Sequence, residues 1–142
     1  MRPLSLNEYE SPAPPPLLGL DESALGALNY VRLVALECRS AARADLFQAC
    51  AVLTQDKTVA HRAYAETLVK CLSQALGIKP VFYAPGVSEI SFDEAWLVRL
   101  IQSSASGDLD SFVFLIRSRV PHIAQRNLAF LVHAISDSFN QT

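Results

Sequence analysis

The sequence predicts an all-α fold, a single-domain irregular or orthogonal bundle of five or six helices with a Pro-rich N-terminal arm. Apolar residues recur at helical spacing in long segments, Gly and Pro residues separate these segments, and Ser91-Phe92-Asp93-Glu94 has the pattern of a helix capping box. Only residues 81–83 and 112–116 resemble strands. An α+β fold with a small hairpin made from these two segments is the alternative.

The composition is unusually apolar for a chain without a membrane-spanning segment. Hydrophobic residues make up 51% of the chain and charged residues 18%, whereas soluble domains have about 45–50% and about 25%. The length of 142 residues fits one helical domain, 21–142, behind an arm at 1–20. The surplus of apolar residues predicts that the protein associates, most simply with itself as a homodimer.

Charge and cysteine content argue against several classes of function. The formal net charge is −2 and the pI is about 5.9, so we expect neither nucleic acid nor a membrane as a partner. The three cysteines lie in apolar segments, as buried thiols of a reducing compartment do, and the N-terminus has no apolar signal segment. These features predict a cytoplasmic protein.

The arm at 1–20 contains five of the eight prolines. Proline fixes φ and lacks the backbone N–H, so the arm is not expected to be helical and polyproline II is favoured. Pro12 and Pro15 match the spacing of an SH3 ligand, but an arm or linker is the more frequent meaning of such a composition.

Residues 22–38 are predicted to form a helix with two apolar stripes. One stripe consists of Leu25, Leu28, Leu33 and Leu36, and the other of Ala27, Val31, Val34 and Cys38. A surface helix has one stripe only, so this helix is expected at the centre of the fold or at an interface. Asn29 and Arg32 fall inside the leucine stripe. We interpret them as polar groups satisfied across a helix–helix contact, with anchors of a ligand pocket as the alternative.

Two helices are predicted next, over 41–53 and 57–76. The inward residues of the first are Leu46, Phe47, Cys50 and Leu53, and those of the second are Tyr64, Leu68, Cys71, Leu72 and Ala75. Gly77 is placed just after the last turn. His61 lies near the centre of the stripe with Tyr64 and Leu68 and is interpreted as a neutral histidine at the edge of the core, with a metal ligand or a catalytic base as the alternative.

A connection at 78–90 precedes the capping box and a helix that runs to about Ser104. Its inward residues are Trp96, Leu97, Leu100 and Ile101, with Arg99 outward. Residues 111–119 are predicted to form a buried helix rather than a strand, because acidic residues precede it and Arg117 and Arg119 end it.

The last helix is predicted from Pro121 to about Phe139. Its main stripe consists of Leu128, Leu131, Val132, Ile135 and Phe139. Ile123 and Phe130 point the other way, which indicates two buried faces.

Known catalytic motifs are absent: there is no G-x-G-x-x-G, Walker A, C-x-x-C, H-E-x-x-H or G-x-S-x-G pattern. No Glu is followed by His three residues later, which argues against a ferritin-type di-iron site. We therefore expect no metal, no cofactor and no catalytic residue. His133 and Asp137 are four residues apart and are interpreted as a surface pair on a helix rather than as a catalytic pair.

One group of residues stands out as a candidate ligand site. Arg117, Arg119, His122 and Arg126 cluster around the bend at Pro121, where a helix N-terminus adds free N–H groups. Such a cluster can bind a phosphate or a carboxylate. The alternative is a solvated helix end whose arginine stems cover apolar surface.

From residue 91 onward the order of capping box, short helix, Gly107-Asp108, apolar helix and basic bend resembles small, uncharacterised all-helical proteins of alphaproteobacteria. By arrangement the resemblance covers residues 21–140. It implies an all-helical fold and brings no activity and no catalytic residues with it.

Taken together, these features predict a non-enzymatic helical interaction or regulatory module that self-associates. The alternative is a protein that binds a small anionic ligand, or an atypical enzyme, through the cluster at 117–126.

Overall fold

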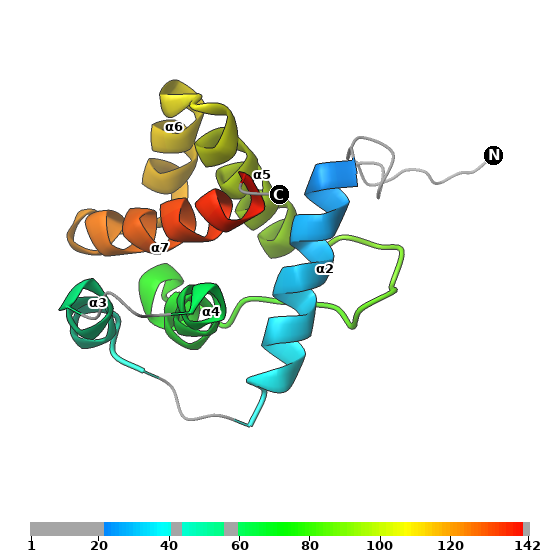
Figure 1. Ribbon diagram of the computed structural model, residues 1–142, viewed down its shortest axis with the longest axis horizontal. Coiled ribbons are helices and arrows are strands. Elements are labelled where there is room, and N and C mark those ends of the chain that lie inside the picture. The colour runs from blue at the N-terminus through cyan, green and yellow to red at the C-terminus, as the bar shows by residue number, and fades with distance from the viewer. Residues whose placement is uncertain (1–21, 41–43, 56–59, 141–142) are drawn as a thin grey trace.

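The computed structural model describes residues 22–40, 44–55 and 60–140, and these residues form helices and loops without a strand (Figure 1). The helices are α2 (Glu22–Glu37), α3 (Leu46–Gln55), α4 (His61–Leu76), α5 (Phe92–Ser106), α6 (Leu109–Arg119) and α7 (His122–Asn140). The predicted all-α class is confirmed and the hairpin alternative is wrong. The arm at 1–20 lies outside the described residues.

Helix α7 holds the bundle together, because it packs against α3, α4, α5 and α6. Helix α2 crosses α4 and α5 at the edge of the bundle (Figure 1). One long connection, the α4–α5 loop of residues 78–90, passes beside α2. None of the helices in the described part of the chain is long and apolar enough to traverse a lipid bilayer.

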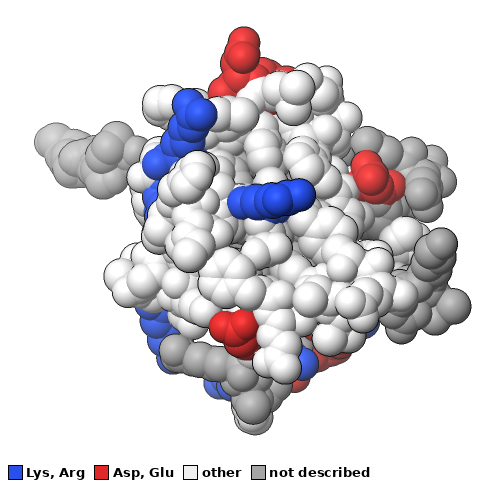
Figure 2. Space-filling view, turned by 90° about the vertical axis from the view of Figure 1, so that its left-hand side faces the viewer, with Lys and Arg blue, Asp and Glu red and all other residues white. Residues whose placement is uncertain are grey.

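Few charged side chains cover the side of the bundle formed by α3, α6 and the start of α7 (Figure 2). Phe47 and Val52 of α3 are 39% and 62% exposed. Ile123 at the start of α7 is 75% exposed. These side chains are part of the apolar surplus that the composition indicates.

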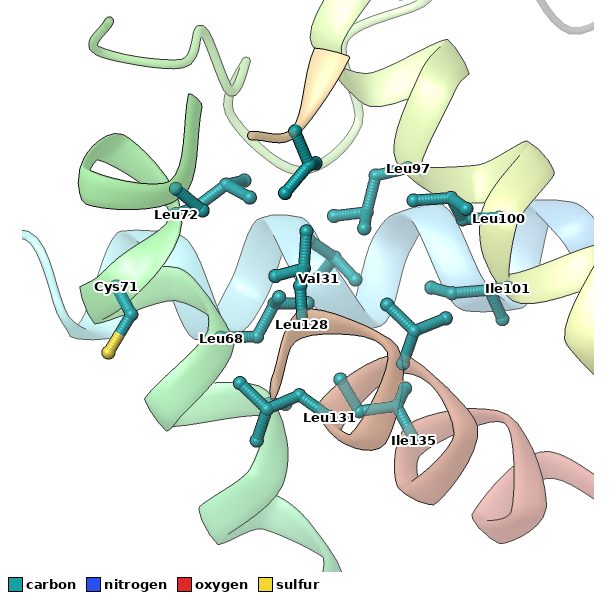
Figure 3. Close-up of a cluster of buried hydrophobic side chains, with 14 of the residues drawn as sticks. Val31, Leu68, Cys71, Leu72, Leu97, Leu100, Ile101, Leu128, Leu131 and Ile135 are labelled. Atoms are coloured by element: carbon teal, nitrogen blue, oxygen red, sulfur yellow. The ribbon is translucent and has the colours of Figure 1, made fainter. Parts of the chain in front are cut away.

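The core lies where α2, α4, α5 and α7 meet (Figure 3). Its fully buried side chains include Val34, Leu68, Leu72, Leu97, Leu100, Leu128, Leu131 and Ile135. All of them belong to stripes that the periodicity predicts. Of the two stripes of α2, the one with Ala27, Val31 and Val34 packs into the bundle.

Helix ends follow the local signals in the sequence. The Ser91 hydroxyl accepts from the N–H of Glu94, and the Glu94 carboxylate accepts from the N–H of Ser91, each at 3.0 Å. Gly77 and Gly107 end α4 and α5 in the left-handed region, with φ of 76° and 75°. Glycine adopts this conformation without the steric cost of a Cβ, so both residues act as helix stops.

Several predicted inward residues are exposed. Phe112 and Ile116 are buried in α6, but Phe114 between them is 71% exposed, so the predicted fully buried run is wrong. It is an amphipathic helix whose buried residues are four apart. The inward placement of Phe47 is also wrong, because its side chain is 39% exposed. Ile123, which was expected on a second buried face of the last helix, is 75% exposed, so that expectation is wrong as well.

Two corrections concern the predicted helices at 41–53 and 57–76. Helix α3 begins at Leu46, because the Asp45 carboxylate accepts from the N–H of Gln48 at 2.9 Å and caps the helix there. This bond is the main cause that lowers the pKa of Asp45. His61 is the first residue of α4 and is exposed, so it does not lie at the edge of the core.

Burial raises the pKa of the Cys71 thiol to about 11 from its ordinary 9.0. This side chain is fully buried and donates to the carbonyl of Ala44 at 3.2 Å. Because the folded pKa lies above the unfolded one, its contribution to stability is present below pH 9.0 and is lost as the pH rises towards about 11.

At pH 8 we expect a maleimide to modify the half-buried Cys38 in the folded protein, and Cys71 only when the chain unfolds. Mass spectrometry of the labelled peptides over time measures both rates. Equal rates at the two thiols would contradict the buried position of Cys71.

Candidate functional site

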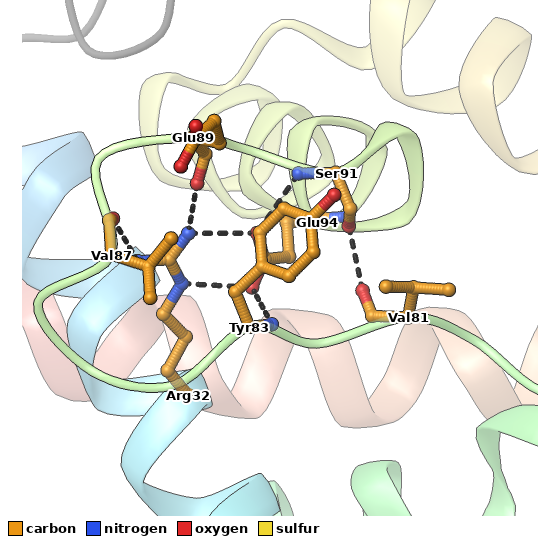
Figure 4. A network of polar contacts seen from close by, with 7 residues as sticks. All are labelled: Arg32, Val81, Tyr83, Val87, Glu89, Ser91 and Glu94. Carbon is orange, nitrogen blue, oxygen red and sulfur yellow. Dashed lines mark hydrogen bonds and ion pairs between the residues drawn. The ribbon is translucent and has the colours of Figure 1, made fainter.

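Arg32 and Glu94 form a buried ion pair between α2 and α5 (Figure 4). Each residue is 1% exposed. Arg32 Nε lies 2.8 Å from Glu94 Oε2, and Nη2 lies 2.9 Å from Oε1, so the contact is bidentate. Arg32 therefore bridges a helix–helix contact, as predicted, whereas Asn29 is exposed and that part of the prediction is wrong.

The same ion pair fixes the α4–α5 loop. Arg32 Nη1 donates to the carbonyl of Val87 at 2.7 Å, and Nη2 donates to the carbonyl of Glu89 at 2.5 Å. Glu94 Oε2 accepts from the N–H of Tyr83 at 2.8 Å. A loop without helix or strand is thus held at three points by two buried side chains (Figure 4).

A second ion pair links α5 to α6. Arg119 Nη2 lies 2.7 Å from Asp93 Oδ1, and Asp93 Oδ2 accepts from the N–H of Val81 at 2.8 Å. The Arg119 guanidinium lies 4.9 Å from the ring centroids of both Phe92 and Trp96. Such cation–π contacts and a close carboxylate account for the direction of this side chain.

The structure thereby separates one member of the predicted anion cluster from the others. Arg119 is turned towards α5 and is neutralised by Asp93, whereas Arg117, His122 and Arg126 are exposed. A common anion site for all four stays a prediction.

A cleft of about 490 Å³ lies beside this network, between α2, α4 and the α4–α5 loop. Its volume falls in the range of about 300–1,000 Å³ that is typical of small-molecule sites. Arg39, Lys70 and Lys79 line it, and no carboxylate side chain is among its described lining residues. The side chains of these three cations have neither an ion pair nor a hydrogen bond to the rest of the described chain.

Apolar side chains, including Leu36, Val69 and Phe82, form much of the remaining lining, and the polar residues Ser73 and Tyr83 also line the cleft. The half-buried thiol of Cys38 also lines it. A second hollow of about 880 Å³ beside α5 and α6 is lined by both Arg99 and Asp110, so it has no preference for one sign of charge. The cleft is therefore the described cavity with a consistent chemical character.

Sequence reasoning missed most of this cleft. Arg32 was singled out, but Arg39, Lys70 and Lys79 were not, because no motif joins them in the sequence. Arg39 follows the end of α2, Lys70 lies within α4 and Lys79 lies in the α4–α5 loop. Only the crossing of α2 over α4 brings them together.

His133 has a partner that the sequence did not indicate. Its Nδ1 lies 2.5 Å from Ser104 Oγ, which is 2.7 Å from Ser136 Oγ, and its ring stacks on Phe112 at 4.5 Å. A serine beside a histidine is the first requirement of a nucleophilic site. Ser104 lies within α5, however, so its backbone N–H belongs to the helix and is not available to bind an oxyanion. We therefore assign this cluster to packing between α5, α6 and α7.

No three His, Cys, Asp or Glu side chains of the described ranges converge as metal ligands. Comparison of the chain with family models, with curated proteins and with solved structures gave no match. The resemblance to alphaproteobacterial proteins stays a prediction, and function is argued from the geometry alone.

Proposed function

We propose that this protein is a non-enzymatic interaction module that pairs with a second copy of itself through the outward face of α2. The observation that carries the proposal is the lack of charge on this face. Between Glu22 and Glu37 the only charged residue of α2 is Arg32, and it is buried. A helix that faces water normally has charged residues on its outer side.

The outward face of α2 is also apolar. Leu33 and Leu36, two members of the predicted leucine stripe, are 42% and 43% exposed. Its other stripe packs into the bundle, and Leu28 of the leucine stripe is buried against Val98 of α5. One copy of the chain therefore leaves Leu33 and Leu36 exposed, and a second copy supplies cover for them.

The residues of this face suit a two-fold symmetric contact between antiparallel helices. Gly26 and Asn29 are exposed beside the leucines, and the space where a Cβ of Gly26 would lie is empty. A two-fold axis near Asn29 places Gly26 of each copy opposite Leu33 of the partner subunit. A large side chain then packs against a small one, and the two helices can approach closely.

Leu33→Glu is expected to convert the dimer into a monomer, because it places two carboxylates in an apolar contact. Sedimentation velocity over a range of protein concentrations measures the change. The matched control is Ile123→Glu on α7, which makes the same kind of exchange at a side chain that is 75% exposed. The proposal is contradicted if the wild-type protein is monomeric at the highest concentration. It is also contradicted if Ile123→Glu dissociates the dimer and Leu33→Glu does not.

Gly26→Gln separates self-association from folding. Replacing a helical glycine with a good helix former is expected to raise the stability of the monomer by about 0.5–1 kcal/mol. The long side chain simultaneously prevents close approach of a second helix. The midpoint temperature of thermal unfolding of dilute protein should therefore rise, and the sedimentation coefficient of concentrated protein should fall.

A further inference from the structure

We propose that the cleft between α2, α4 and the α4–α5 loop binds a single-chain amphiphile whose head is a phosphate monoester. This goes beyond self-association, because the cleft is complete within one chain. It also differs from the cluster at 117–126, none of whose members lines the cleft.

The charge of the cleft selects the head group. Arg39, Lys70 and Lys79 line it together, while Glu37 at the end of α2 is engaged by Arg62 on the outside. Because no carboxylate is among the described lining residues, these three cations attract an anion. A phosphate monoester, with a charge of about −1.5 to −2 at pH 7, neutralises them better than a carboxylate does. Lysine is also a common phosphate ligand.

The apolar lining selects the tail. Leu36, Val69 and Phe82 provide a surface that a free phosphate ion does not use. An alkyl chain that covers these side chains gains about 25 cal/mol for each Å² of apolar surface removed from water. A ligand with both a phosphate and one alkyl chain therefore uses both halves of the cleft.

The cleft is preformed, which favours binding of a small ligand. One of its walls is the α4–α5 loop, and the carbonyls of Val87 and Glu89 and the N–H of Tyr83 are held by the buried Arg32–Glu94 pair. A wall that is already fixed does not lose conformational entropy when the ligand enters.

Isothermal titration calorimetry of the full chain with decyl phosphate, below its micellar concentration, tests the proposal. Lys70→Gln and Lys79→Gln are each expected to weaken binding about tenfold, as the loss of one charge-assisted hydrogen bond does. The matched control is Arg99→Gln, an exposed cation of α5 outside the cleft, which should leave the affinity unchanged. Circular dichroism confirms that each variant is folded.

Titrations with three further ligands test whether both the phosphate head and the alkyl tail are needed for binding. Inorganic phosphate and decanol should each bind more weakly than decyl phosphate, and decyltrimethylammonium should not bind. Equal affinity for any of the three would overturn the proposal, as would a loss of affinity in Arg99→Gln that matches the loss in Lys70→Gln. If decyl phosphate does not bind at all, the proposal is wrong.

Cys38 locates the ligand. Its thiol lines the cleft, whereas Cys50 and Cys71 are buried in the core. Decyl phosphate is expected to slow the reaction of Cys38 with a maleimide, and calorimetric binding without this protection would place the ligand elsewhere.

The Leu33→Glu variant should bind decyl phosphate as the wild type does. Loss of binding in that variant would overturn the claim that one chain forms the cleft. If the wild-type protein is monomeric and still binds decyl phosphate, the self-association proposal is wrong and the ligand proposal stands.

Discussion

Arg32→Met is expected to lower the free energy of unfolding by about 3–5 kcal/mol. Methionine fills the space of the arginine stem but leaves the carboxylate of Glu94 buried without a cation. The carbonyls of Val87 and Glu89 lose their donors at the same time. Removal of one partner from a buried pair costs far more than removal of an exposed charge, because the remaining charge has no water to solvate it.

Urea denaturation followed by circular dichroism measures this loss. Arg39→Met is the matched control, because Arg39 lies just beyond the end of α2, is exposed and has no ion pair with the described part of the chain. It should change the stability by no more than about 0.5 kcal/mol. Amide hydrogen exchange gives an independent readout, since the N–H of Tyr83 should exchange faster in Arg32→Met only. Equal stability of the two variants would show that the buried pair does not hold the loop.

Trp96→Ala is expected to destabilise the protein by about 3–5 kcal/mol. The Trp96 side chain is 4% exposed, its Nε1 donates to the carbonyl of Leu115 at 2.9 Å, and its ring lies beside the Arg119 guanidinium. The substitution therefore leaves a cavity between α5 and α6, an acceptor without its donor, and an arginine without its aromatic neighbour.

Trp96→Phe distinguishes these contributions. It retains an aromatic ring in the core but removes the Nε1 donor, so it should cost about 1–3 kcal/mol, less than the alanine variant. Because Trp96 is the single tryptophan of the chain, the unfolding of both variants is followed by circular dichroism rather than by fluorescence. A loss in Trp96→Phe equal to that in Trp96→Ala would show that the hydrogen bond, not the packing, dominates this contact.

The two functional proposals use adjoining surfaces of α2 that meet at Leu36. Leu33 and Leu36 are exposed on the outward face of the helix, and Leu36 also lines the cleft together with Arg39, which follows the end of α2. The buried Arg32 orients α2 on α5 and fixes the loop. Each proposal is tested by its own variant, Leu33→Glu for self-association and Lys70→Gln for the cleft.

Features that depend on neighbours in the sequence were predictable. The capping box of Ser91 and Glu94 and the helix stops at Gly77 and Gly107 are formed by residues within one helical turn. The stripes of α4, α5 and α7 follow from the helical period, so most of their buried apolar residues were predicted, whereas Ala65, Val98 and Ala124 were missed. The start of α3 was missed, because Asp45 was not recognised as its cap.

Features that depend on how helices cross were not predictable. Glu94 was recognised as a capping residue, but its partner Arg32 is 62 positions away. Arg119 was grouped with the other basic residues at the bend, but it pairs with Asp93 of α5. His133 was paired with Asp137, but it contacts Ser104 of α5. Each of these side chains had several possible partners of suitable chemistry.

The sequence by itself determined the helices, most of their ends and which of their residues are apolar enough to be buried. Helix formation and capping involve atoms a few residues apart, so local chemistry decides them. Only the tertiary structure decided which residues of the two stripes of α2 are covered, and which cations meet in the cleft. Both depend on the angles at which α2, α4 and α5 pack, and those angles are set by the combined fit of side chains from distant segments.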